Sequence, residues 1–254
     1  MSELLILITN DDGYSSKGIK ALINAVKNLG KILIVAPDSP QSGMGHAISV
    51  NKPIRCYKTN FFDSVEAYCC TGTPVDCIKM GLYLLKDKKP DLILSGINHG
   101  SNVSTNILYS GTMSAAVEGA LSGIPSVGYS LTDYSDDADF QYSEKIVQII
   151  SKKVIKEGLK KGTCLNVNIP KLKEEHIKGI KICRQANGYW REDFDKRKSP
   201  FGKEYYWLSG EFVNKDKGED TDIWALENGF ISIVPVQFDL TAHHMIQKLN
   251  SWDI

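Results

Sequence analysis

Residues 4–13 read LLILITNDDG, and this segment is the strongest indication of the architecture of the chain. Its first six residues form a short apolar run, which is typical of a strand covered on both faces of a sheet. A polar turn follows, and residues 16–28 then place Ile19, Leu22, Ile23 and Val26 at helical spacing. We therefore expect the chain to open with a buried strand, a polar turn and an amphipathic helix.

The same alternation continues along the chain. Further strands are predicted at residues 31–36, 91–95, 126–130 and 165–169, and further helices at residues 111–121 and 143–155. Another helix is expected to begin with Thr73 as its N-cap and Pro74 in its first turn. This β-α-β order predicts an α/β protein with a Rossmann-like, doubly wound, mostly parallel sheet in three layers.

The pattern changes near residue 185. Residues 185–222 are charged and aromatic and show no helical stripe, so we interpret them as a protruding arm or hairpin, with a long surface loop as the alternative. The exposed aromatic residues would suit a subunit contact. A last strand is predicted at residues 230–234 and a last helix at residues 240–249, inside a C-terminal extension of residues 230–254. Residues 1–254 are interpreted as one domain with these two appendages.

Composition narrows the class of protein. A chain of 254 residues with 42% hydrophobic and 24% charged residues is typical of one globular α/β domain. The formal net charge of zero argues against polymeric nucleic acid as a partner. The apolar run at residues 4–8 is too short for a secretory signal, and no stretch is long enough for a membrane span. The six cysteines form no C-x-x-C pair and are expected to be reduced, so we expect a soluble cytoplasmic protein.

Three polar clusters each follow a predicted buried strand directly: NDDG at residues 10–13, DSPQSG at 38–43 and GINHG at 96–100. In an open parallel sheet, ligands bind at the carboxyl ends of the strands, so these clusters should converge. Asp11, Asp12, Ser42 and Asn98 would then form a partial shell of oxygen ligands. Such a shell favours Mg²⁺ or Mn²⁺ over Zn²⁺, because no histidine or cysteine is needed.

Each cluster taken alone has a simpler interpretation. An Asp-Asp-Gly sequence after a strand is just as typical of a turn and a helix start, because Asp caps helices and Gly allows positive φ. Ser42 alone suits a loop hydroxyl, and Asn98 alone suits a turn. The coincidence of all three clusters at strand ends is what favours the metal site.

Residues 109–114, YSGTMS, open the helix predicted at residues 111–121. The free backbone N–H groups of a helix N-terminus bind anions, and Ser110 and Thr112 add hydroxyl donors. Ordinary N-capping is the alternative. His46 and His99 lie beside the predicted site loops and could donate a proton or contact substrate, although a surface or supporting role is the commoner use of such residues.

The sequence resembles the SurE family, the stationary-phase survival protein, a group of metal-dependent 5′(3′)-nucleotidases. The resemblance rests on TNDDG (residues 9–13), VAPDSPQSG (35–43) with His46, TGTP (71–74), SGINHG (95–100) and SGT (110–112), and on later matches at YYW (205–207), TD (221–222) and DLTAH (239–243). It implies metal ligation by Asp11, Asp12, Ser42 and Asn98. It also implies a C-terminal extension exchanged between the subunits of a homodimer or homotetramer. His99 stands where several members of the family carry arginine.

The resemblance and the residues together predict a metal-dependent nucleotidase with one divalent ion per subunit, Mg²⁺ or Mn²⁺. Its substrates would be nucleoside 5′-monophosphates, and 3′-monophosphates and short polyphosphate are further candidates. Asp11, Asp12 and Asn98 would carry catalysis, with the metal binding a phosphate oxygen and lowering the pKa of the attacking water. The phosphate contacts are assigned to Asn10, Gly43, Ser110, Gly111 and Thr112.

Two alternatives remain open at this point. Asp11 or Asp12 could be the nucleophile of a covalent aspartyl phosphate mechanism. The chain could also be a nucleotide- or phosphate-binding module without turnover, since an open α/β architecture does not by itself define an activity.

Overall fold

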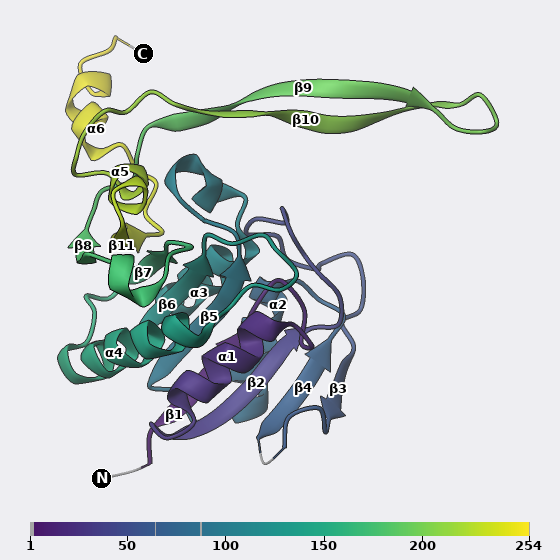
Figure 1. Cartoon of the computed structure of the whole chain (residues 1–254), viewed down its shortest axis with the longest axis vertical. Coiled ribbons are helices and arrows are strands. Elements are labelled where there is room, and N and C mark those ends of the chain that lie inside the picture. Colours follow the sequence, from purple (N-terminus) through teal and green to yellow (C-terminus); the bar gives the residue numbers. More distant parts are fainter. Residues whose placement is uncertain (1–2, 64, 87, 254) are drawn as a thin grey trace.

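A sheet of nine strands, in the order β3-β4-β2-β1-β5-β6-β7-β11-β8, forms the centre of the computed structural model (Figure 1). The structure describes residues 3–63, 65–86 and 88–253. The strands are β1 (Leu5–Thr9), β2 (Lys31–Pro37), β3 (Cys56–Thr59), β4 (Glu66–Cys70), β5 (Leu92–His99), β6 (Ser126–Leu131), β7 (Thr163–Ile169), β8 (Gly179–Ile182) and β11 (Phe230–Gln237). Neighbouring strands from β4 to β7 are all parallel, whereas β3 pairs with β4 and β11 pairs with β7 in the antiparallel sense.

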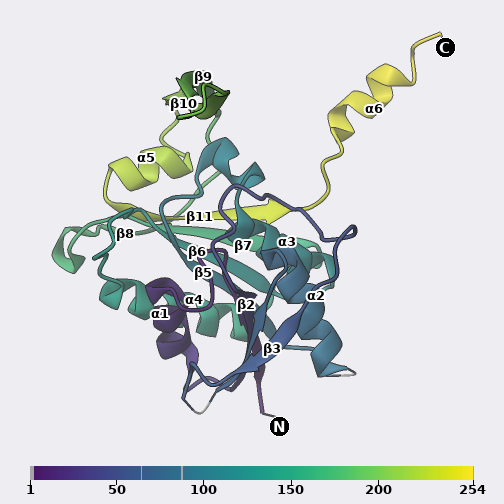
Figure 2. The ribbon, with the colours of Figure 1, turned by 90° about the vertical axis from the view of Figure 1, so that its right-hand side faces the viewer.

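Helices cover both faces of this sheet. α1 (Lys17–Val26) and α4 (Gln141–Glu157) lie on one side, and α2 (Pro74–Leu85) and α3 (Gly111–Leu121) lie on the other (Figure 2). The apolar run of β1 supplies both layers: Ile6 and Ile8 pack with α1 and α4, while Leu7 packs with residues of α2 and α3. All three side chains are fully buried, as a strand covered on both faces requires. The doubly wound α/β prediction is therefore confirmed.

Sequence-local interactions set the starts of three helices. The Ser16 hydroxyl accepts a hydrogen bond from the Ile19 N–H and begins α1, and the Ser110 hydroxyl does the same for α3 with the Met113 N–H. Thr73 and Asp76 form a reciprocal capping box at the start of α2, where Pro74 occupies the first turn. These caps explain why the helix starts predicted from the sequence lie within a residue or two of those observed.

Some elements differ from the prediction. β5 runs to His99 instead of ending at residue 95, and its pairing with β6 is irregular between Ser95 and Asn98. The first four residues of the GINHG cluster therefore lie at the end of a strand, and only Gly100 lies outside it. The sequence analysis did not predict β3, β4, β8, the short helix α5 (Asp222–Glu227), or the 3₁₀ helices η1 (Ser104–Leu108) and η2 (Glu174–His176).

Two segments extend from the body of the protein. β9 (Gly188–Lys198) and β10 (Glu204–Asn214) pair only with each other in an antiparallel hairpin, which we call the arm (Figure 1). α6 (His243–Leu249) reaches away from the sheet (Figure 2). It begins three residues later than predicted, and Asp239, which precedes it, contacts the His243 ring at 2.7 Å. Within the described part of the chain, no helix combines the length and apolar character needed to cross a membrane.

Candidate metal and phosphate site

The predicted site lies where the order of the sheet reverses. The chain passes from β1 to β2 on one side and later returns to place β5 on the other side of β1. Ligands of doubly wound proteins bind at the carboxyl ends of the strands at such a point. Asp11 and Asp12 follow β1 there, and Asn98 lies at the end of β5. The His99 N–H donates to Asp12 Oδ2 at 3.2 Å and ties the two segments together.

Asp11 is the most perturbed carboxylate of this group. Only 5% of its surface is exposed, and the Thr112 hydroxyl donates to its Oδ1 at 2.5 Å. Burial, and then the neighbouring charge of Asp12, raise the pKa of Asp11 to about 6. Burial also raises the pKa of Asp12, against the lowering effect of the His99 N–H. Two carboxylates that disfavour each other's charge provide a place where a cation would be stabilised.

The start of α3 packs directly on Asp11. A Cβ atom on Gly111 would lie 2.7 Å from the Cβ of Asp11, so only glycine allows this approach. Thr112 is fully buried and uses its hydroxyl on Asp11. The predicted phosphate contacts Gly111 and Thr112 thus support the carboxylate from below in this structure, while Ser110 caps the helix beside it.

The loop after β2 is fastened on two sides. The Gln41 N–H donates to the Asp11 carbonyl at 2.7 Å, and the Gly45 N–H donates to the Tyr109 carbonyl at 3.1 Å. These bonds hold Ser42 and Gly43 between the turn after β1 and the start of α3. Gly43 has a φ of +75° and nothing within 4 Å of its would-be Cβ atom, so its backbone is open to a ligand.

A group that the sequence analysis missed holds the same loop to the helices. Glu118 on α3 accepts from the His46 ring at 3.0 Å and from Lys79 Nζ on α2 at 2.6 Å. The Glu118 side chain is 8% exposed, and its contact with His46 holds the pKa of its carboxyl below the usual range. Glu118 lies 72 residues from His46 and 39 from Lys79, so no local pattern in the sequence predicts the cluster.

A cavity of about 670 Å³ opens at this point, which is a size typical of small-molecule sites. Five of the predicted residues line it: Asp11, Ser42, Gly43, Asn98 and Ser110. The other predicted residues, Asn10, Asp12, Gly111 and Thr112, are not among its lining residues. His99 lines it as well, with its half-buried ring packed against Phe140 at 4.9 Å, and burial lowers the pKa of that ring.

Asn10, which was predicted as a phosphate contact, lies in the turn after β1. It is fully buried, and its amide nitrogen donates to the Gly13 carbonyl and to Ser16 Oγ, both at 2.9 Å. Both amide hydrogens are thereby used inside the turn. In this structure Asn10 joins the turn after β1 to the start of α1.

The chemistry of the donors suits a hard divalent cation. The site offers two carboxylates, the Ser42 hydroxyl and the side-chain oxygen of Asn98, whose amide nitrogen is engaged with the Gly100 carbonyl at 2.8 Å. All of these are oxygen donors, as Mg²⁺ and Mn²⁺ prefer. Nowhere in residues 3–63, 65–86 and 88–253 do three or more His, Cys, Asp or Glu side chains gather as metal ligands, so a site with soft or imidazole ligands has no counterpart there.

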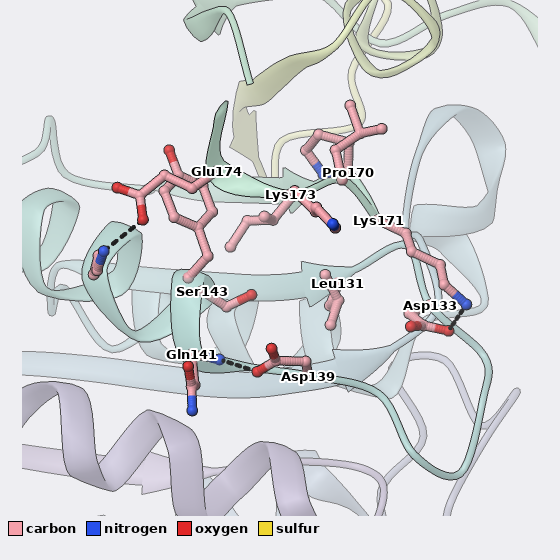
Figure 3. A pocket seen from close by; sticks show the side chains of 13 residues that line it. Leu131, Asp133, Asp139, Gln141, Ser143, Pro170, Lys171, Lys173 and Glu174 are labelled. Atoms are coloured by element: carbon pink, nitrogen blue, oxygen red, sulfur yellow. Dashed lines mark hydrogen bonds and ion pairs between the residues drawn. The ribbon is translucent and has the colours of Figure 1, made fainter. Parts of the chain in front are cut away.

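A second cavity, of about 490 Å³, lies between the start of α4 and the ends of β6 and β7 (Figure 3). Four of its charged groups form ion pairs: Lys171 contacts Asp133 at 2.8 Å, and Lys145 contacts Glu174 at 2.5 Å. The Lys171 contact lowers the pKa of Asp133 to about 2. None of the predicted site residues lines this cavity.

The chain is an α/β protein with a carboxylate pair and an oxygen-rich cavity at the switch point of its sheet, and it belongs to the SurE family. The family model described as survival protein SurE matches residues 6–192. The 5′-nucleotidase SurE of Christiangramia forsetii is 58% identical over 252 residues, which cover 98% of this chain and 97% of that relative. The enzyme of the same name from Flavobacterium psychrophilum is 57% identical over 255 residues, covering 100% and 99%.

A solved structure supports the same assignment. The crystal structure of the SurE protein from Aquifex aeolicus matches with a TM-score of 0.83 at 41% identity. The match covers 97% of this chain and 98% of that structure. The similarity therefore includes the sheet, the helices on both faces and most of the segments that follow β7.

Proposed function

We propose that this protein is a metal-dependent 5′-nucleotidase, which hydrolyses nucleoside 5′-monophosphates to nucleoside and phosphate. The observation that carries the proposal is the convergence of Asp11, Ser42, Asn98 and Ser110 on one cavity, with Asp12 next to the buried Asp11 carboxylate. The names of the relatives from C. forsetii and F. psychrophilum support the same reaction. Nucleoside 3′-monophosphates and short polyphosphate are further candidate substrates.

The proposed ligands of one divalent ion, Mg²⁺ or Mn²⁺, are Asp11, Asp12, Ser42 and Asn98. When bound, such an ion polarises a phosphate oxygen and lowers the pKa of water. The protein's own part is to hold these oxygens in place. Thr112 fixes the Asp11 carboxylate, the His99 N–H fixes Asp12, and the Gly100 carbonyl orients the Asn98 amide.

The phosphate is proposed to lie between the Gly43 backbone and the start of α3. The first N–H groups of a helix carry partial positive charge, which offsets the charge that develops on a phosphoryl group during transfer. Ser110 lines the cavity at that end. The buried Thr112 and Gly111 act on phosphate indirectly, through the position of Asp11.

We further propose that the protein acts as a homodimer or homotetramer in the cytoplasm. The arm exposes large apolar side chains, including Phe201 at 92% and Trp207 at 60%, and the C-terminal segment exposes Leu240 at 87%. Exposed apolar surface of this kind is typical of subunit contacts. The six cysteines are all free thiols, as suits a reducing compartment.

The test is phosphate release from a panel of 5′- and 3′-nucleotides and short polyphosphates, with Mg²⁺, Mn²⁺ or a chelator. We expect release that requires the metal, and we expect Asp11→Asn to abolish it while the protein stays folded. Asp137→Asn, in the exposed loop at residues 133–139, is the matched control and should retain activity.

Two outcomes would overturn the proposal. Nucleotide binding without phosphate release would indicate a binding module. A phosphorylated or fluoride-trapped adduct on Asp11 or Asp12, detected by mass spectrometry, would indicate a covalent mechanism in place of an activated water.

A further inference from the structure

The cavity has two chemically different ends. The end formed by the core contains the oxygen donors and the start of α3, as described above. The other end is formed by the base of the arm and two tyrosines of the core loops: Trp190, Glu192, Leu208, Ser209, Gly210, Tyr109 and Tyr134. Metal and phosphate chemistry gives no role to this second wall, which is largely aromatic and apolar.

Trp190 is held in a fixed position at this wall. Its Nε1–H donates to Asn106 Oδ1 in η1 at 2.7 Å, and its ring meets the edge of Phe212 at 5.7 Å and 72°. The base of the arm is fastened to the same 3₁₀ helix, because the Gly188 N–H donates to Ser104 Oγ at 3.0 Å. The indole is nevertheless 43% exposed and lines the cavity. It therefore offers a preorganised apolar surface to a ligand at little cost in conformational entropy.

The pairing of the arm places four of its five wall residues on one face of the hairpin, and Ser209 lies between two of them. Side chains two residues apart along a strand share a face, which groups Trp190 with Glu192 on β9 and Leu208 with Gly210 on β10. Glu192 pairs directly with Gly210, where a Cβ atom would lie 2.3 Å from the Arg191 carbonyl oxygen. The bare backbone at Gly210 keeps the wall open beside Trp190.

The charges of the cavity favour one orientation of a bound nucleotide. Glu192 stands at the arm end and repels a phosphate there, whereas the start of α3 attracts it at the core end. A nucleotide placed with its phosphate at the core end would extend its base toward the arm. Aromatic side chains bind bases by stacking, which tolerates any base because every base has a π face.

We propose that the base of the arm forms a nucleobase-binding subsite, with Trp190 as the stacking platform and Leu208 and Tyr109 beside it. This inference rests on the proposed function, because it assigns the second half of the substrate of the same site. It predicts that the arm contributes to substrate recognition in addition to any part in assembly. It also predicts recognition of the base by its face, and hence broad tolerance among bases.

The test compares AMP with ribose 5-phosphate, which carries the same phosphoester without a base. For Trp190→Ala we expect KM for AMP to rise about tenfold or more, because one stacked base is lost. KM for ribose 5-phosphate should stay within about twofold of the wild-type value. Trp190→Leu keeps apolar volume without a π system and should behave like the alanine variant, whereas Trp190→Phe should retain most of the affinity for AMP.

Trp207→Ala is the matched control. Trp207 lies on the same arm and is 60% exposed, and it is not among the residues that line the cavity. The Trp207→Ala variant should have unchanged KM values for AMP and for ribose 5-phosphate. Equal increases for both substrates with Trp190→Ala, or no increase for either, would overturn the subsite.

A second measurement separates this inference from the proposed function. Binding of adenosine, which has no phosphate, is measured by calorimetry on the wild-type protein and on the Trp190 variants. Adenosine binding that is lost in Trp190→Ala and Trp190→Leu supports the subsite even if the wild-type protein hydrolyses neither phosphoester. Adenosine binding that is equal in all variants, or absent from the wild-type protein, contradicts it.

Discussion

Thr112 shows how one buried hydroxyl can control the proposed metal site. Its Oγ1 donates to Asp11 Oδ1 at 2.5 Å, and both residues are buried. Groups that orient a ligating carboxylate typically contribute about 10- to 100-fold to metal affinity or activity. We therefore expect Thr112→Val, which keeps the shape and removes the donor, to raise the metal concentration needed for half-maximal activity by about that factor.

Thr112→Ser is the matched control, because it keeps the hydroxyl and loses only a methyl group. It should bind metal nearly as well as the wild-type protein. Both variants are compared by titrating Mn²⁺ against phosphate release from AMP and by thermal unfolding without metal. Wild-type metal dependence in Thr112→Val would show that the hydrogen bond to Asp11 has no functional role.

Individual site residues were predictable to different extents. Asp11, Ser42 and Asn98 could be assigned to one cavity because each follows or ends a strand, and the carboxyl ends of parallel strands meet. The role of Thr112 could not be assigned in the same way. Whether its hydroxyl faces phosphate or Asp11 depends on how α3 is rotated about its axis, and packing against β1 decides that. The direction of the Asn10 amide, which turns toward Gly13 and Ser16, could not be read from the sequence for a similar reason.

Among the elements, α3 has two roles. Its N-terminus lies at the proposed phosphate site, and its Glu118 joins it to α2 and to the loop after β2. A carboxyl whose pKa is lowered in the folded state stabilises the fold above its unfolded pKa. That stabilisation is lost as the pH falls through the folded pKa. The pKa of Glu118 is lowered, chiefly by its hydrogen bond with the His46 ring, so its contribution is complete at neutral pH and disappears in acid.

Glu118→Gln should accordingly lower the free energy of unfolding by about 1–2 kcal/mol at neutral pH, which is below the roughly 1.5–3 kcal/mol of hydrogen bonds to charged groups because His46 and Lys79 are partly exposed. The difference from the wild-type protein should shrink below about pH 4, where the unfolded carboxyl becomes protonated. Urea unfolding over that pH range measures it. Glu157→Gln removes an exposed pair with Lys153 and should cost little at any pH. A Glu118→Gln effect that does not change with pH would exclude the ionic contribution.

The elements missed by the sequence analysis share a physical character. β3, β4 and β8 have four or five residues and lie at or near the edges of the sheet, where only part of each strand is buried. They lack the continuous apolar run that identified β1 and β2, because an edge strand is not covered on both faces. The central strands were predictable because a buried strand has a continuous apolar run, and the helix starts were predictable because capping residues lie next to them in the sequence.

At the scale of the whole molecule, the arm outside the α/β body exposes apolar surface to solvent. An isolated two-stranded hairpin is only marginally stable in water, and the outer part of the arm, beyond the base that lines the cavity, exposes several aromatic residues: Phe201, Tyr205, Tyr206 and Trp207. A second subunit would cover this surface, which agrees with the proposed assembly. The base of the arm, in contrast, is fastened to η1 and lines the cavity. The two parts of the arm can therefore be separated by experiment.

Phe194 and Leu208 face each other in the register of the arm, so residues 195–207 can be replaced by an Asn-Gly turn between them. Asn-Gly favours the tight turn that joins two paired strands. The shortened protein keeps Trp190, Leu208 and the rest of the cavity wall. We expect the shortened protein to form a smaller oligomer than the wild-type protein, as measured by its mass in light scattering. Its unfolding temperature and its KM for AMP should stay close to the wild-type values. Tyr83→Ser removes an aromatic residue of α2 that is 77% exposed and should leave the mass unchanged. If the shortened protein keeps the wild-type mass, the outer arm has no role in assembly, and its aromatic residues need another partner.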